Sequence, residues 1–150
     1  MLQKERKLLI FTLGDESYAA DIMEVERILG YERPTPLPEV PEFIQGVMNY
    51  EGNILPVVSL SKKFNLPFIE SLDNKIIVVK EKDSKIGIVV NQVSEVITLK
   101  ESEIDEPPSI SSGISKRYII GLLNRNERIV IFLNLSEVLS EQEKEQFIGE

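Results

Sequence analysis

The sequence predicts an all-β protein with minor helices, and the pattern of its apolar residues is the main reason. The apolar runs are short and β-branched, and turn-forming Gly, Asp, Asn and Glu residues separate them. The clearest runs are residues 8–11, 76–79, 86–90 and 129–133. Short strands at close spacing with such turns between them are typical of a β-barrel or a β-sandwich.

The first expected helix follows the opening strands. Ile22, Val25 and Ile28 recur every three residues, a spacing that places side chains on one face of a helix. Asp21 is a residue type that caps helix N-termini. A short helix is therefore predicted near residues 21–29.

The second expected helix lies at the C-terminal end, near residues 137–148, where Glu, Gln and Lys dominate. Ser140 and Glu143 have the spacing of a capping box, in which each side chain bonds the backbone of the other residue. We expect this helix to follow the last strand.

An internal repeat suggests how the strands are organised. Residues 46–61 align without gaps on residues 121–136, and five positions are identical, among them Gly46 with Gly121. Residues 8–28 align in the same way on residues 76–96. Two matches in the same order indicate a duplicated unit.

The predicted organisation is a single domain over residues 1–150, made of two pseudo-repeated barrel subdomains. The repeat halves are about 8–66 and 76–148, and exchange of strands between the barrels stays open. A length of 150 residues suits one domain, or two very small ones that share a core. A groove between two such copies would suit a binding partner.

Composition excludes several kinds of function. The chain has no Cys and no His, which removes the usual zinc ligands, thiol nucleophiles and Ser-His-Asp triads. The formal net charge of -8 disfavours nucleic acid as a partner. No apolar run approaches the ~20 residues of a membrane-spanning helix, and no signal peptide is recognised, so we expect a cytoplasmic protein without membrane insertion.

Motifs for catalysis or cofactor binding are weak. Ser59 and Lys62 have Ser-x-x-Lys spacing but lack the companion motifs of enzymes that use it. Glu24 and Glu26 form a carboxylate pair of a kind that arises freely among 25 acidic residues. The acidic loop 100–113 lacks the order of a calcium loop. We expect no metal, no cofactor and no catalysis, with a small hydrolase that uses Lys62 or a carboxylate pair as the alternative from another class.

Four apolar residues stand at equivalent places in the two repeats: Val25 and Ile28 in the first, Val93 and Val96 in the second. Each could belong to the core or line a groove that meets a partner, and the sequence leaves both readings open.

Three segments resemble the CheW family of chemotaxis coupling proteins. Residues 43–60 (FIQGVMNYEGNILPVVSL) match the family signature, as does the opening Gly14-Asp15-Glu16, Tyr18-Ala19, Asp21-Ile22 before Val25. Residues 87–93, followed by Glu95-Val96, look like a third family motif. The resemblance extends from about residue 8 to residue 148.

The resemblance implies two SH3-like five-stranded β-barrels around a shared core. It also implies a non-catalytic adaptor in two-component signalling, whose partners are the cytoplasmic tip of a chemoreceptor and the regulatory domain of the histidine kinase CheA. The positions that the family motifs assign to receptor binding in the groove are Val25, Ile28, Gly46, Gly87, Val93 and Val96. A CheW-like paralogue or regulatory module that serves a different receptor array is the alternative.

Two charged positions depart from the family pattern. The resemblance places Arg where this chain has Glu51 and Glu where it has Arg27. We therefore expect Arg27 and Glu51 to form an ion pair at the groove edge with its signs exchanged. Because Coulomb attraction does not depend on which partner is positive, the double exchange should weaken coupling less than either single exchange. Two independent solvated charges are the alternative.

Overall fold

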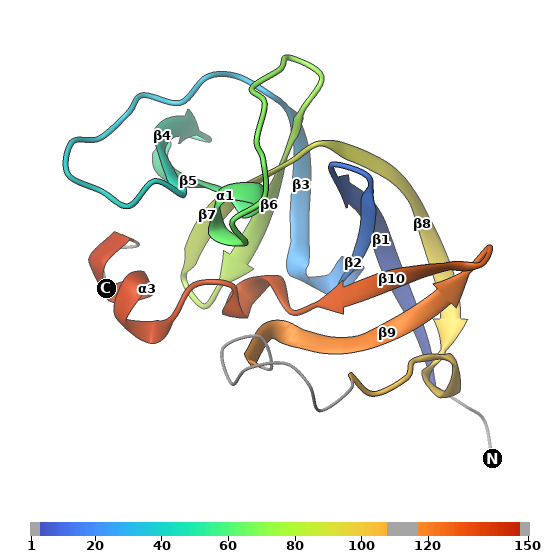
Figure 1. Cartoon of the computed structure of the whole chain (residues 1–150). Helices are drawn as coiled ribbons and strands as arrows, with labels where there is room; N and C mark the ends of the chain where they lie inside the picture. The colour runs from blue at the N-terminus through green and yellow to red at the C-terminus, as the bar shows by residue number, and fades with distance from the viewer. Residues whose placement is uncertain (1–3, 108–116, 148–150) are drawn as a thin grey trace.

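The computed structural model describes residues 4–107 and 117–147 and contains two five-stranded sheets (Figure 1). Sheet A has the strand order β8-β1-β2-β10-β9, and sheet B has the order β3-β6-β7-β5-β4. The strands of sheet A are β1 (Glu5–Leu13), β2 (Glu16–Asp21), β8 (Gln92–Lys100), β9 (Ile119–Arg125) and β10 (Arg128–Leu133). Those of sheet B are β3 (Val25–Gly30), β4 (Ile44–Tyr50), β5 (Asn53–Ser59), β6 (Lys75–Glu81) and β7 (Ser84–Val90). The short helical segments are η1 (Ile22–Glu24), α1 (Leu60–Lys63), η2 (Glu101–Glu103), η3 (Leu135–Glu137) and α3 (Glu141–Phe147).

The two sheets share one topology. When β1 to β5 are matched in order to β6 to β10, the strand order of one sheet becomes that of the other. Sheet A joins the first two strands, β1 and β2, to the last three, β8, β9 and β10, whereas sheet B consists of the five strands between them, β3 to β7. A duplicated unit with exchanged hairpins would give this arrangement; the division into repeat halves itself stays a prediction.

An apolar core lies between the sheets. It is built from buried residues of both sheets, such as Leu9 and Phe11 of β1 and Ile77 and Val79 of β6, together with residues near the C-terminus. Smaller clusters belong to a single sheet, with Leu8, Ile10, Ala19, Leu99, Leu123, Val130 and Phe132 in sheet A and Tyr31, Tyr50, Leu55, Val57, Ile76, Val78 and Val89 in sheet B. The expectation of an all-β protein with two five-stranded units around a shared core is confirmed.

The predicted helix near residues 21–29 is wrong for most of its length. The helical part is the single 3-10 turn η1, which Asp21 caps through a 2.9 Å bond from the Met23 N–H to its Oδ1. Strand β3 then begins at Val25. A bulge between Val25 and Arg27 shifts the pairing with β6, so Val25 lies opposite Val79 and Ile28 opposite Ile77. The extra residue of the bulge puts two side chains three apart on the same face, which mimics helical spacing.

The predicted C-terminal helix is present but shorter than expected. Helix α3 begins after Ser140, whose backbone N–H donates to Glu143 Oε1 at 2.8 Å while the Glu143 N–H donates to Ser140 Oγ at 3.1 Å. The capping box is therefore confirmed. The residues before it form the separate turn η3, and the predicted end at residue 148 lies outside the described residues.

Gly46 has a structural role at the outer edge of β4. The loop before β4 is bonded to this edge by two backbone hydrogen bonds between Thr35 and Val47, at 2.8 and 2.9 Å. Gly46 has a φ of 136°, and a Cβ added there would lie 2.0 Å from the Thr35 carbonyl oxygen. The repeat-equivalent Gly121 stands in the same relation to Asp105, which bridges to Leu122 of β9.

An ion pair joins the two edge strands of each sheet. In sheet B, Arg27 Nη2 of β3 lies 3.4 Å from Oε2 of Glu51, which follows β4. In sheet A, Glu95 Oε2 of β8 lies 2.9 Å from Arg125 Nη2 of β9. Since β3 and β4 are the outermost strands of sheet B, and β8 and β9 those of sheet A, each sheet curls until its edges meet. The charge order is opposite in the two sheets.

The pair in sheet B is not isolated. Lys85 Nζ of β7 lies 3.5 Å from the other oxygen of Glu51 and 3.0 Å from Glu26 Oε2. Among the contacts of the described residues, the Glu95–Arg125 pair has no comparable third charge. We call the meeting edges of each sheet its seam. The stability of the two seams should therefore respond differently when the charges of their ion pairs are exchanged.

We expect Gly46→Ala to lower the free energy of unfolding by about 1–3 kcal/mol, because the new methyl group must displace the Thr35 backbone. Urea denaturation gives this value. Gly30→Ala is the matched control, since Gly30 has nothing within 4 Å of an added Cβ and its substitution should change stability by less than about 0.5 kcal/mol. Equal effects of the two substitutions would contradict the assigned role of Gly46.

We expect the double exchange Arg27→Glu with Glu51→Arg to leave the protein less stable than the wild type, because the guanidinium introduced at position 51 would face the Lys85 ammonium. The double exchange Glu95→Arg with Arg125→Glu should stay close to wild type, since an exposed pair is worth only about 0.2–1 kcal/mol in either order. Urea denaturation of both double variants and their single variants gives the free energies of unfolding that test these two expectations. Full recovery of stability by the sheet B exchange would show that Lys85 does not act on the pair.

Candidate functional site

The four apolar residues that the sequence singles out lie on the two edge strands β3 and β8. Like β3, β8 has a bulge, so Val93 lies opposite Phe11 and Val96 opposite Leu9 of β1. Phe11 and Leu9 belong to the core between the sheets, as do the partners of Val25 and Ile28 on β6. We call Val25, Ile28, Val93 and Val96 the apolar rim, because all four face the shared core from its edge.

Exposure divides the apolar rim into inner and outer residues. Val25 and Val93 are half-buried and pack against the shared core. Ile28 and Val96 are 39% and 51% exposed. Both readings that the sequence left open therefore apply, core for the inner residues and surface for the outer ones. A large apolar side chain that is half exposed beside a core is the kind of surface a partner can cover.

The other two candidate residues, Gly46 and Gly87, are buried. A Cβ on Gly87 would lie 2.9 Å from Ile76 Cγ2 and 3.1 Å from Leu55 Cδ2, inside sheet B. Packing of the fold explains the absence of a side chain at both positions. They lie on β4 and β7, outside the strands that carry the apolar rim, and present no side chain to a partner.

The charged groups at the sheet B seam form a connected network around Tyr50. The Tyr50 hydroxyl donates to Glu26 Oε2 at 2.7 Å, and Lys85 Nζ donates to the same carboxylate. The hydrogen bonds from Tyr50 and Lys85 lower the pKa of Glu26, while the bond to Glu26 raises the pKa of both Tyr50 and Lys85. Arg27 and Lys85 also lie 5.7 and 5.4 Å from the centre of the Tyr50 ring. The directions of these pKa shifts keep Glu26 and Lys85 charged and Tyr50 neutral near neutral pH.

A hollow of about 500 Å³ opens beside this network, between β3 and β4. Its lining is mixed and includes the charged Arg27 and Glu51, the aromatic Tyr31 and Tyr50, and the aliphatic Leu29 and Met48. No cluster of acids, bases and nucleophiles converges in it. The arrangement suits contact with another surface better than chemistry on a small molecule.

Ser59, the nucleophile of the alternative hydrolase reading, is used by the fold. Its side chain is buried, and its Oγ accepts a 3.2 Å bond from the Lys62 N–H as the N-cap of α1. The Lys62 ammonium lies 5.6 Å over the Phe68 ring. Ser59 and Lys62 thus form the start of a helix, in which the serine hydroxyl accepts a hydrogen bond from the Lys62 backbone N–H.

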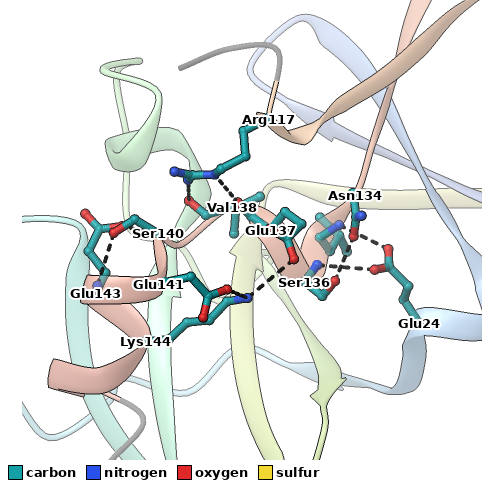
Figure 2. Close-up of polar contacts among 11 residues, drawn as sticks. Glu24, Arg117, Asn134, Ser136, Glu137, Val138, Ser140, Glu141, Glu143 and Lys144 are labelled. Atoms are coloured by element: carbon teal, nitrogen blue, oxygen red, sulfur yellow. Dashed lines mark hydrogen bonds and ion pairs between the residues drawn. The ribbon is translucent and has the colours of Figure 1, made fainter. Parts of the chain in front are cut away.

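Sequence reasoning missed Tyr50, Lys85 and Glu24. Glu24 accepts backbone hydrogen bonds from Leu135 at 3.0 Å and Ser136 at 3.2 Å, more than 100 residues along the chain (Figure 2). No local pattern reveals such a contact, because backbone N–H groups have no sequence signature. Lys85 follows a turn in the β6–β7 hairpin, and only the curled sheet brings it to Glu51.

The described part of the chain lacks a metal-ligand cluster and a helix that could span a membrane. Within residues 4–107 and 117–147, no group of three or more Cys, His, Asp or Glu side chains is placed to hold a metal ion. Over the same residues, no helix has the length and apolar character needed to cross a bilayer.

Comparisons with known proteins agree on one family. The CheW-like domain family matches residues 7–143. "Chemotaxis protein CheW" of Klebsiella aerogenes is 34% identical over 139 residues, which cover 92% of this chain and 84% of that protein. The Treponema pallidum protein of the same name is 30% identical over 142 residues, which cover 91% of this chain and 84% of its own length.

A solved structure is similar over nearly the whole chain. The crystal structure of "scaffolding protein TtCheW" from Thermoanaerobacter tengcongensis superimposes with a TM-score of 0.83 at 31% identity, covering 95% of this chain and 97% of that one. Sequence and structure therefore agree over both sheets. The chain belongs to the CheW-like domain family of chemotaxis scaffold proteins.

Proposed function

We propose that this protein is a non-catalytic adaptor that couples the cytoplasmic tip of a chemoreceptor to the histidine kinase CheA in the cytoplasm. Family membership across residues 7–143 is the observation that carries the proposal. The names of the relatives, chemotaxis proteins and a scaffolding protein, support the same role. The use of Ser59 as a helix cap supports a function without catalysis.

The apolar rim is the proposed receptor surface. An amphipathic helix binds by laying apolar side chains against an apolar surface, with anchors three or four residues apart. Ile28 and Val96 offer exposed aliphatic surface on two different sheets, and both stand beside the shared core. A receptor helix that contacts both would touch sheet A and sheet B together.

The seam of sheet B favours a second candidate, coupling within a different receptor array. The Arg27–Glu51 pair carries its charges in the order opposite to that implied by the family resemblance. A partner that contacts this edge through charged groups would need its charges in the order opposite to that of a partner of the usual family pattern. Separate binding assays with fragments of different receptor classes distinguish the two candidates.

We expect Val96→Asp to reduce affinity for a receptor cytoplasmic fragment by about tenfold or more, because a carboxylate would be desolvated against an apolar helix. The fold should survive, since Val96 is half exposed. Val25→Asp, in contrast, should destabilise the protein itself, because Val25 packs on the shared core. Circular dichroism and isothermal titration calorimetry on the same samples measure both effects.

Ile69→Asp is the matched control for Val96→Asp. Ile69 is a 77% exposed aliphatic residue in the loop before β6 and is not part of the apolar rim. Its substitution should leave receptor affinity unchanged. Unaltered binding by a folded Val96→Asp variant would remove Val96 from the site, and an equal loss with Ile69→Asp would show that net charge, not the apolar rim, governs binding.

A further inference from the structure

The connections that leave sheet A for sheet B run side by side. Strands β2 and β10 are parallel neighbours, with Ala20 opposite Leu133, so both leave sheet A at the same end. The chain continues from β2 through η1 into β3 of sheet B. From β10 it continues through η3 to α3. We call η1 and η3 the two crossovers.

The second crossover is anchored to sheet B at several points. Leu135, Val138 and Leu139 are buried in the core between the sheets. Farther along, Lys63 Nζ of α1 lies 2.9 Å from both oxygens of Glu143 in α3. Burial opposes ionisation of Glu143, but bonds from Lys63 and Ser140 outweigh it and lower its pKa. The segment after η3 is therefore tied to α1, which follows β5 of sheet B.

Glu24 joins the two crossovers directly. It is the last residue of η1, and Figure 2 shows its carboxylate turned toward Ser136 and Asn134 at the start of η3. Each carboxylate oxygen accepts one backbone N–H, from Leu135 and from Ser136. These are the first two N–H groups of η3, which have no partner inside the turn. Asn134, the N-cap of η3, makes no side-chain cap bond of its own.

The other end of η3 is also held from outside. The Arg117 Nε donates to the Glu137 carbonyl at 3.2 Å, and its Nη2 donates to the Val138 carbonyl at 3.5 Å (Figure 2). A carboxylate at the N-terminus and a guanidinium at the C-terminus both complement the peptide dipoles of the turn. Arg117, just before β9, and Glu24 of η1, both distant in sequence, therefore fix the position of η3.

The equivalent connections at the other end of the molecule lack such a clamp. There β5 and β7 are the parallel neighbours, and the chain leaves them for α1 and β8. The N-terminus of α1 is capped by its own neighbour Ser59. Gln92, which matches Glu24 in the repeat, donates instead to the Asp73 carbonyl at 3.3 Å. Among the described residues, only the η1–η3 side has a carboxylate that spans both connections.

We propose that Glu24 is a positioning residue that locks the orientation of sheet B relative to sheet A, and so sets the relative position of the two halves of the apolar rim. Val25, the first residue of the rim, follows Glu24 directly, and Ile28 is in the same strand. Val93 and Val96 are on sheet A. A partner that spans both sheets would bind weakly to a molecule in which their orientation varies. The consequence for binding rests on the proposed receptor function; the clamp itself does not.

Distances between two spin labels test the clamp in the full chain. The sequence has no cysteine, so Asn49→Cys on β4 and Asn124→Cys on β9 give one label on each sheet without background. Both positions are exposed. Glu24→Gln is introduced into this labelled chain. A carboxamide can accept from one N–H but turns its own donor toward the other, so the two-point clamp is lost.

Two variants at Ser136 test the clamp from the donor side. Ser136→Pro removes one of the two N–H groups that donate to Glu24, an N–H in the first turn of η3 that has no partner inside the turn. Ser136→Ala keeps this N–H and removes only the 2.7 Å bond between Ser136 Oγ and Asn134. Glu145→Gln, an exposed residue of α3, controls for the loss of one negative charge.

The expected result is a broader distance distribution for Glu24→Gln and Ser136→Pro, and the wild-type distribution for Ser136→Ala and Glu145→Gln. Affinity for a chemoreceptor cytoplasmic fragment should fall about fivefold or more in the first two variants only. Circular dichroism confirms that each variant is folded, and Ser136→Pro carries the test if Glu24→Gln does not fold.

A distribution as narrow as the wild type in both Glu24→Gln and Ser136→Pro would overturn the clamp, whatever happens to binding. A wild-type chain that binds no receptor fragment would overturn the proposed function. In that case the distance measurements still decide on the clamp.

Discussion

The apolar core between the two sheets is the constraint on which the rest of the structure depends. Sheet A is not made of consecutive strands: the chain leaves it after β2, builds the whole of sheet B from β3 to β7, and returns to sheet A at β8. Sheet A therefore needs strands from both ends of the chain before its own small core can form. The shared cluster, which includes Leu9, Phe11, Ile77 and Val79, is the place where strands of both sheets meet. Burial of this cluster favours the packing of sheet B against the two separate parts of sheet A.

The four edge strands differ in how far they are covered, and this difference indicates which part of the surface is open to a partner. The outer edges of β4 and β9 are covered by loop residues Thr35 and Asp105, which reach them because Gly46 and Gly121 have no side chain. Covered edges do not recruit other strands. On β3 and β8, bulges turn apolar side chains toward the shared core and leave Ile28 and Val96 partly exposed. The proposed receptor surface is thus the partly exposed edge of the shared core on β3 and β8.

Much of this fold was predictable from the sequence because its signals are local. The β-branched runs became β1, β6, β7 and β10, and the spacing of Ser140 and Glu143 gave a true capping box. Spacing failed at residues 21–29, because a bulge gives a strand the same three-residue recurrence as a helix. Close packing accounts for the absence of a side chain at the motif positions Gly46 and Gly87, and their assignment to receptor binding stays a prediction.

The charged contacts were also only partly predictable from the sequence. The contact between Arg27 and Glu51 was expected from sequence, and the pair is present. Its coupling to Lys85, and the bonds from Leu135 and Ser136 to Glu24, were not predicted. Both depend on how the curled sheets bring distant segments together, and no periodicity or spacing encodes them.

Nuclear magnetic resonance of the isotopically labelled chain, titrated with a chemoreceptor cytoplasmic fragment, tests whether the receptor binds the apolar rim. We expect the amides of Val25 and Ile28 on β3 and of Val93 and Val96 on β8 to shift together, with one common affinity. The amide of Ile69 should stay in place. Shifts confined to one sheet, or centred on the loop around Ile69, would contradict a receptor site built from the border of the shared core.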